Sequence, residues 1–304
     1  MINLCVDAGT INCPCPMAET GDCLICSRLS GSEKCDCQWM GVCIYNEFVQ
    51  NDRKVRNTRH NFKAKILSKK FYGDDILIME LDVPKGFALQ ALHPGSFVFM
   101  KPVGENDYYN TPISVMEANH DEGTISVAIK VVSSKTKKIA AAEDYIEIRG
   151  VYRNGLIGGG ARQLVQDKKN GAKWLIIAKG IALAPAVKLV NWAGDNIDVD
   201  LVIDPDKIND EIIRDFLVVP AMQISFLTDL ELFDEEMTSG YDRVIILTSN
   251  YFIKTIKTQL KIPDVKLVYC NNFNMCCGEG ICGACVYTDE NGNSYKTCKC
   301  NLNG

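Results

Sequence analysis

The chain has 304 residues, of which 47% are hydrophobic and 23% charged, and its net charge is −5. This length allows two ordinary domains and a small third one, and the composition is that of a globular protein. The acidic balance argues against a nucleic-acid-binding protein, which needs a basic face. No signal peptide is apparent, and no apolar run reaches the ~18 residues that a membrane helix needs. We therefore expect a cytoplasmic protein without a membrane span.

Residues 1–55 form a cysteine-rich segment with little hydrophobic periodicity. Clustered thiols without a secretory signal favour metal binding over disulfide bonds. The candidate ligands form close pairs followed by a single cysteine, namely Cys13, Cys15, Cys23, Cys26, Cys35, Cys37 and Cys43. Because no histidine lies nearby, an additional iron–sulfur cluster is favoured. Two clusters, structural zinc and the absence of any metal are the alternatives.

Residues 56–160 contain short runs rich in β-branched and aromatic residues, separated by turn residues. The runs cover residues 62–68, 75–81, 96–100, 124–132 and 145–149. Runs of this length and spacing predict a small antiparallel β-barrel. After the fourth run, hydroxyl groups and a lysine lie together in residues 133–136, which suits a phosphate group. A plain polar hairpin is the alternative there.

Residues 161–268 alternate between apolar strands and helices. Strands are predicted at 174–178, 199–203, 223–227, 243–247 and 265–269, and helices at 184–192, 209–216 and 250–260. This alternation predicts a Rossmann-like parallel sheet with helices on both faces. No nucleophile–histidine–acid set or pair of carboxylates for hydrolysis is evident, so we assign no catalytic residue.

Residues 269–304 contain the most specific pattern in the chain. Three cysteines with C-x4-C-x2-C spacing and a distant fourth match the plant-type 2Fe–2S ligand loop. The four candidate ligands are Cys277, Cys282, Cys285 and Cys298. The glycines of the loop permit the tight turns that wrap thiolates around one cluster. Zinc, which prefers paired C-x2-C units, is the alternative.

The fourth ligand is expected to follow a hairpin with strands at 286–288 and 294–297. Three further cysteines fall outside the ligand pattern: Cys270, Cys276 and Cys300. We interpret each of them as a small buried residue.

The order of a β-barrel, an α/β domain and a plant-type cluster loop resembles the ferredoxin-reductase superfamily. It is similar to the electron-transfer subunit of class B dihydroorotate dehydrogenase and to the small flavin subunit of NADH-dependent ferredoxin–NADP oxidoreductases. The resemblance covers roughly residues 60–300 and excludes the first 50. Its local matches are the segments 93–100, 111–115, 130–136 and 150–155.

This resemblance implies FAD between the barrel, which binds it, and the α/β domain, with a 2Fe–2S cluster near it. The residues it assigns to cofactor binding are Thr111, Pro112, Ile113, Ser114, Lys130, Ser134, Thr136, Gly155 and, in the nicotinamide loop, Gly180. It further implies an electron-transfer subunit that relays electrons between FAD and iron–sulfur clusters. The partner would be a catalytic or electron-accepting subunit of a hetero-oligomer.

Departures from the family pattern affect both nucleotide sites. Thr111 replaces the usual flavin-binding arginine, only Gly180 remains of several loop glycines, and Thr248-Ser-Asn250 replaces a Cys-Gly-Pro segment. We therefore predict that NAD(P) binds weakly. The alternatives are a non-catalytic, metal-stabilised scaffold with decayed flavin and NAD sites, and a complete NADH:acceptor reductase.

Overall fold

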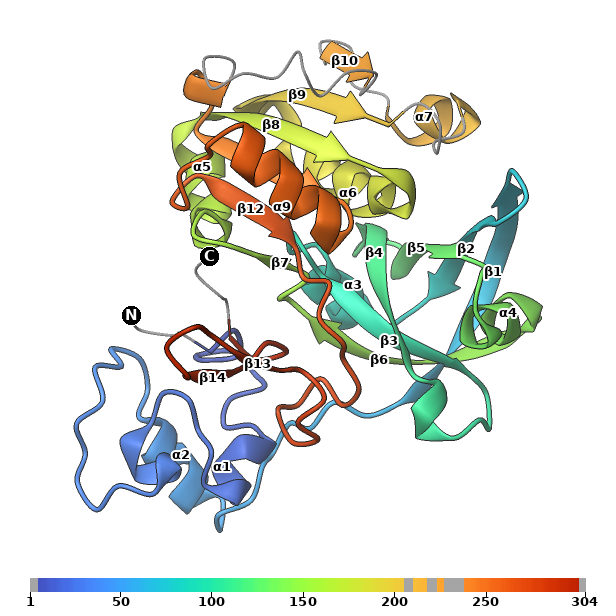
Figure 1. Cartoon of the computed structure of the whole chain (residues 1–304). Helices are drawn as coiled ribbons and strands as arrows, with labels where there is room; N and C mark the ends of the chain where they lie inside the picture. Colours follow the sequence, from blue (N-terminus) through green and yellow to red (C-terminus); the bar gives the residue numbers. More distant parts are fainter. Residues whose placement is uncertain (1–4, 205–209, 218–222, 227–237, 301–304) are drawn as a thin grey trace. The chain divides into compact units, whose positions relative to one another are not determined.

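The computed structural model describes residues 5–204, 210–217, 223–226 and 238–300. These residues belong to two compact units. The central unit contains the described residues between 61 and 272, and the terminal unit contains residues 5–60 and 273–300. The cysteine-rich segment and the cluster loop, at opposite ends of the sequence, therefore share one unit (Figure 1). The four-part division at residues 55, 160 and 268 stays a prediction.

The first half of the central unit is a closed antiparallel barrel with the strand order β1-β2-β5-β4-β3-β6. Its strands are β1 (Phe62–Tyr72), β2 (Ile76–Asp82), β3 (Phe97–Pro102), β4 (Thr111–Asn119), β5 (Thr124–Lys130) and β6 (Tyr145–Tyr152). Its helical segments are α3 (Lys85–Ala91), η2 (Asp107–Tyr109) and α4 (Ser134–Ala141). Alternate side chains fill the barrel, such as Leu77, Met79 and Leu81, each 0% exposed. The predicted barrel is confirmed.

The second half is a six-stranded sheet with the order β10-β9-β8-β11-β12-β7. Its strands are β7 (Leu156–Ile157), β8 (Ala172–Ala178), β9 (Ile197–Ile203), β10 (Gln223–Phe226), β11 (Arg243–Leu247) and β12 (Leu267–Cys270). Its helical segments are η3 (Ala161–Gln163), α5 (Leu164–Asn170), η4 (Gly180–Ala182), α6 (Leu183–Ala193), η5 (Gly194–Asn196), α7 (Asp210–Phe216) and α9 (Asn250–Gln259). Strands β8 to β12 run parallel, and only β7 is antiparallel. The strand order reverses between β8 and β11, where open α/β sheets bind nucleotides.

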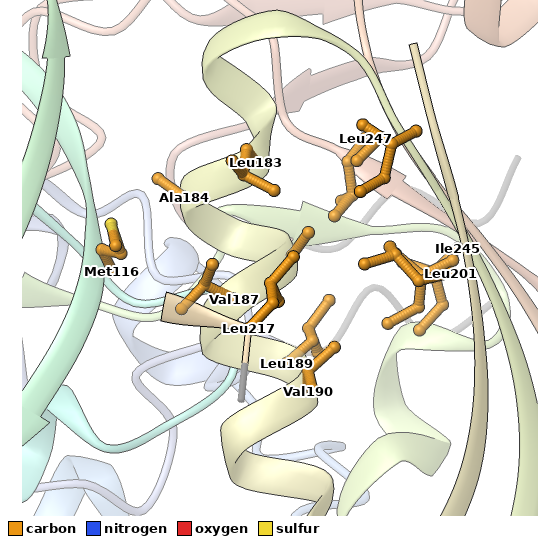
Figure 2. Close-up of a cluster of buried hydrophobic side chains, with 14 of the residues drawn as sticks. Met116, Leu183, Ala184, Val187, Leu189, Val190, Leu201, Leu217, Ile245 and Leu247 are labelled. Carbon is orange, nitrogen blue, oxygen red and sulfur yellow. The ribbon is translucent and has the colours of Figure 1, made fainter. Parts of the chain in front are cut away.

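Helix α6 is buried on both sides. Figure 2 shows Met116 of the barrel on one side of this helix and Leu201, Ile245 and Leu247 of the sheet on the other. Helix α9 packs on the opposite face of the sheet through Ile256 and its neighbours. The predicted arrangement of helices on both faces is confirmed, and one continuous core joins the sheet to the barrel.

The terminal unit has short elements and a small core. They are α1 (Pro16–Thr20), η1 (Ser27–Ser30), α2 (Ile44–Gln50), β13 (Val286–Thr288) and β14 (Ser294–Lys296). The core consists of Ala18, Cys26, Leu29, Ile44 and Phe48. Strands β13 and β14 form the predicted hairpin before Cys298. Across the described parts of both units, no helix has the length and apolar character required to span a bilayer.

Candidate functional site

The cluster loop, residues 277–285, turns sharply at three glycines. The φ angles are 70° at Gly278, 76° at Gly280 and 74° at Gly283, in the left-handed region that favours glycine. A Cβ atom at Gly280 would also collide with the sulfur of Met17. The tight turns expected from the sequence are therefore present.

Three of the four candidate thiols lie near one another. The Sγ atoms of Cys285 and Cys298 are 3.1 Å apart, and Cys298 is close enough to Cys277 to lower its pKa. The backbone N–H groups of Glu279 and Cys282 donate to Cys277 Sγ at 3.3 and 3.5 Å. The Cys282 side chain is exposed. This donor set, with backbone amides directed at sulfur, fits a 2Fe–2S cluster.

These contacts also set the protonation of the thiols. Hydrogen bonding with Cys298 lowers the pKa of Cys277 to about 3 and that of Cys285 to about 6. The same hydrogen bonds raise the pKa of Cys298, which keeps its proton. Both shifts favour the thiolate, the form that binds iron.

A buried cluster of four charges lies beside this loop. It consists of Asp7, Arg59, Glu279 and Lys299, which we call the charge cluster. Lys299 Nζ lies 2.7 Å from both Asp7 Oδ2 and Glu279 Oε2. Arg59 lies 2.7 Å from Asp7 Oδ1 and 3.3 Å from Glu279 Oε2. Two cations and two anions therefore balance, with the Lys299 side chain 0% exposed.

The charge cluster joins the two ends of the chain. Burial opposes the charge on Asp7, but Lys299 and Arg59 outweigh it and lower the pKa of this carboxyl. Burial likewise opposes the charge on Lys299, whose pKa the two carboxylates nevertheless raise. In the sequence, Glu279 lies between the candidate ligands Cys277 and Cys282, and Lys299 directly follows Cys298. The charge cluster therefore anchors the N-terminal segment to the cluster loop.

The N-terminal cysteines divide into separate groups. Cys13, Cys15 and Cys23 line one cavity together with Cys5, which is not among the candidates selected from the sequence. Burial raises the pKa of Cys5 to about 12 and that of Cys13 to about 11. The remaining candidates have other surroundings: Cys26 lies in the small core, Cys37 is partly exposed, and Cys35 and Cys43 are exposed.

Within the part of the chain that the structure describes, no group of three or more His, Cys, Asp or Glu side chains is arranged to hold a single metal ion. Of the cysteines outside the patterns, Cys300 is buried, as predicted. Cys276 is exposed, so its interpretation as a buried residue is wrong. Its neighbours are loop residues that form no core.

The first four residues of β4 are the candidate flavin contacts Thr111 to Ser114. Ile113 packs inside the barrel, so it can offer a cofactor only its backbone. Pro112 and Ser114 lie on the opposite face of the strand, where Pro112 is exposed and Ser114 partly exposed. Thr111 donates its hydroxyl to Tyr109 O at 2.9 Å.

The predicted polar turn at residues 133–136 is instead the start of helix α4. Ser133 and Thr136 form a capping box: Ser133 Oγ accepts from Thr136 N at 3.2 Å, and Thr136 Oγ1 accepts from Ser133 N at 3.0 Å. The Thr136 hydroxyl is thus occupied within the protein. Ser134 is exposed, and Lys130 lies 3.6 Å from Asp75. A helix N-terminus is nevertheless a favourable place for phosphate.

Gly155 has a packing role. Its N–H donates to Gly95 O at 2.9 Å, and a Cβ atom at Gly155 would collide with the same oxygen. The backbones approach too closely there for any other residue. This close packing therefore accounts for a glycine at position 155 without any contact to a cofactor.

The loop after β8 is the candidate nicotinamide site. Gly180 has a φ of 63°, and Lys179 forms an ion pair with Asp204 and lies 4.6 Å from the ring centre of Phe252. The lysine side chain is thus held beside the carboxyl ends of β8 and β9. Sequence reasoning did not detect this pair because 25 residues separate its members.

Residues at the ends of the neighbouring strands β11 and β12 also contact one another. Thr248 is buried, and its carbonyl oxygen accepts from Asn272 Nδ2 at 2.7 Å. Cys270 Sγ lies 3.6 Å from the same oxygen. The Cys270 thiol of β12 therefore lies next to Thr248, the residue that stands in place of the cysteine of the family's Cys-Gly-Pro segment.

No protein-family model matches this chain. The dihydroorotate dehydrogenase B (NAD(+)) electron transfer subunit of Clostridium perfringens is 23% identical over 221 residues, covering 68% of this chain and 83% of that protein. An uncharacterized protein in the adh 3′ region of Clostridium beijerinckii is 24% identical over 243 residues, covering 74% of this chain and 79% of that protein.

Two solved structures have a similar fold. The NADH-dependent reduced ferredoxin–NADP oxidoreductase, studied for flavin-based electron bifurcation, has a TM-score of 0.56 at 18% identity and covers 77% of this chain and 85% of its own. A type IV self-sufficient cytochrome P450 monooxygenase has a TM-score of 0.52 at 14% identity, over 79% of this chain and 40% of its own. With a closed antiparallel barrel followed by a parallel α/β sheet, this chain has a ferredoxin-reductase-like fold.

Proposed function

We propose that this chain is an electron-transfer subunit of a cytoplasmic oxidoreductase complex, carrying FAD and a 2Fe–2S cluster. The observation that carries this proposal is the grouping of Cys277, Cys285 and Cys298 at a loop that turns sharply at three glycines. The loop belongs to a chain whose other unit is a barrel and a parallel sheet. The likeness to an electron transfer subunit from Clostridium perfringens supports the same role.

The roles of the parts follow from their chemistry. A flavin exchanges two electrons with a hydride carrier and single electrons with a cluster, so it couples the two kinds of transfer. In this proposal the backbone of β4 and the N-terminus of α4 bind FAD, and the cluster loop holds the iron. A catalytic or electron-accepting subunit is the partner, and a further metal centre lies in residues 1–55.

We expect protein purified without oxygen to contain about one FAD per chain. Ser134→Asp should weaken FAD binding about tenfold, because a carboxylate at the exposed first residue of α4 repels the pyrophosphate. The same change favours the helix itself through its dipole, so the fold should be retained. Equilibrium titration of the deflavinated variant with FAD measures the effect.

The matched control is Ser134→Asn, which has the shape of aspartate without its charge and should bind FAD as the unaltered protein does. Equal affinity of the two variants would place the pyrophosphate elsewhere. A complete lack of flavin in freshly prepared protein would favour the scaffold alternative instead.

For the nicotinamide site we expect a dissociation constant for NADH well above about 1 μM, which corresponds to about −8 kcal/mol. The Lys179–Asp204 ion pair lies at the strand ends that a nucleotide would approach, and Thr248 is buried there. Anaerobic titration, followed by flavin absorbance, measures binding and reduction together. Tight binding with rapid bleaching of the flavin would indicate the complete NADH:acceptor reductase.

A further inference from the structure

The cavity at the N-terminus brings together four thiols from three places in the sequence. Cys5 precedes the first turn, Cys13 and Cys15 form a C-x-C pair before α1, and Cys23 follows that helix. Apolar side chains complete the walls, including Met17 and Ile44. Four thiols around a largely apolar cavity are a complete donor set for one metal centre.

The charge cluster lies beside this cavity. Lys299, with its side chain 0% exposed, favours the thiolate form of Cys5 and Cys15, whereas Asp7 opposes it. Lys299 is held 2.7 Å from Asp7, which also lines the cavity. A centre with four thiolates is anionic, so Lys299 offsets part of the cost of removing that charge from water, chiefly at Cys15.

The cavity also adjoins the cluster loop within the terminal unit. Cys5 forms a β-bridge with Cys300, and Val6 N donates to Lys299 O at 2.9 Å. Met17 lines the cavity, and its sulfur would collide with a Cβ atom at Gly280 of the cluster loop. The four thiols are therefore neighbours of the proposed 2Fe–2S site.

We propose that Cys5, Cys13, Cys15 and Cys23 bind one cubane iron–sulfur cluster next to the C-terminal cluster. Four thiolates bind either zinc or an iron–sulfur cluster. The residues that line the cavity include no histidine, which zinc sites often contain, and this favours an iron–sulfur cluster. The proposal deepens the proposed function, on which it rests, by naming the ligands of its second centre. It also excludes Cys26, Cys35, Cys37 and Cys43 from that centre.

The sequence provides a matched test, because the chain contains two C-x-C pairs. One double variant is Cys13→Ser/Cys15→Ser, inside the cavity. The control is Cys35→Ser/Cys37→Ser, which has the same spacing outside it. Iron and zinc contents and EPR spectra of the reduced protein are measured on the full chain, prepared without oxygen.

We expect about six irons per unaltered chain, two from the C-terminal cluster and four from the cubane. Cys13→Ser/Cys15→Ser should lose about four of them and keep the 2Fe–2S signal, which reports that the terminal unit is still folded. The control should keep all six. If the first variant loses both signals, the single variant Cys23→Ser, expected to lose only the cubane, decides the matter.

Iron loss in the control, unchanged iron in the cavity variant, or zinc in place of iron would each overturn the ligand assignment. The proposed function is tested separately. Protein with four irons that depend on Cys13 and Cys15 but no 2Fe–2S signal would support the cubane and contradict the C-terminal cluster.

Discussion

Replacing Cys282 with serine is expected to abolish the 2Fe–2S EPR signal of the reduced protein. Cys282 is exposed at the surface of the loop, so serine fits there without disturbing a core. The change removes one of four ligands, and the backbone N–H of residue 282 can still donate to Cys277 Sγ. The loss should therefore come from the missing thiolate, since the thiolate is the ligand.

The adjacent residue Cys276 provides the control. It is exposed like Cys282 and lies one position before the first ligand, but outside the ligand pattern. Cys276→Ser should keep the full signal and about two irons in the C-terminal cluster. The circular dichroism of both variants should match that of the unaltered protein, since residues 61–272 form a separate compact unit. A full signal in Cys282→Ser would refute the ligand assignment.

The regular elements of the central unit could be predicted because their signals are local. Apolar runs such as 174–178 and 244–247 are buried on both faces of the sheet, so every residue in them contributes to the pattern. The hairpin before Cys298 was likewise predictable from a turn between two short strands. The cluster spacing is also a local pattern, because three ligands fall within nine residues.

Helices α2 and α4 could not be predicted in the same way. Helix α4 buries only Thr136 and Ile139, so its apolar periodicity is too weak to distinguish it from a polar turn. Helix α2 has seven residues and buries Ile44 and Phe48, and two residues do not establish a period. Both helices depend on the surfaces on which they pack, and isolated helices of this length are marginal.

Contacts between distant residues were not visible in the sequence. Asp7 and Lys299 are 292 positions apart, and no pattern connects them. The position of Cys5 in the cavity was missed for the same reason, because its neighbours there are close in space rather than in a recognisable spacing. The structure therefore adds most where the two ends of the chain meet.

Substituting Lys299 with methionine is expected to destabilise the terminal unit by about 3–5 kcal/mol. Methionine retains most of the apolar stem but removes the ammonium group that lies 2.7 Å from both Asp7 and Glu279. Arg59 would then be the only remaining cation of the charge cluster, facing two buried carboxylates. Leaving a buried charge without its partner costs far more than losing a surface pair.

Hydrogen–deuterium exchange of peptides from residues 5–60 measures this local stability, and iron content is determined on the same samples. A loss of 3 kcal/mol corresponds to exchange about a hundredfold faster. The control is Lys296→Met, whose partner Asp22 lies 3.4 Å away with its side chain 53% exposed, and which should cost about 0–1 kcal/mol. Adding Glu279→Met to Lys299→Met restores the balance of one cation and one anion and should recover part of the loss.

The pH dependence provides an independent measure of the same interaction. The pKa of Asp7 is lowered in the folded protein, so its contribution is complete above the unfolded value of about 3.9 and is lost as the pH falls through the folded value. The pKa of Lys299 is raised, so its contribution persists at least up to about pH 10. The stability difference between the unaltered protein and Lys299→Met should thus be constant from about pH 5 to 9 and become smaller at acid pH.

Hydrogen–deuterium exchange rates, corrected for the intrinsic pH dependence of exchange, test this expected pH profile. A difference that vanished at pH 7, or that matched the difference for Lys296→Met, would show that the charge cluster does not hold the two ends of the chain together.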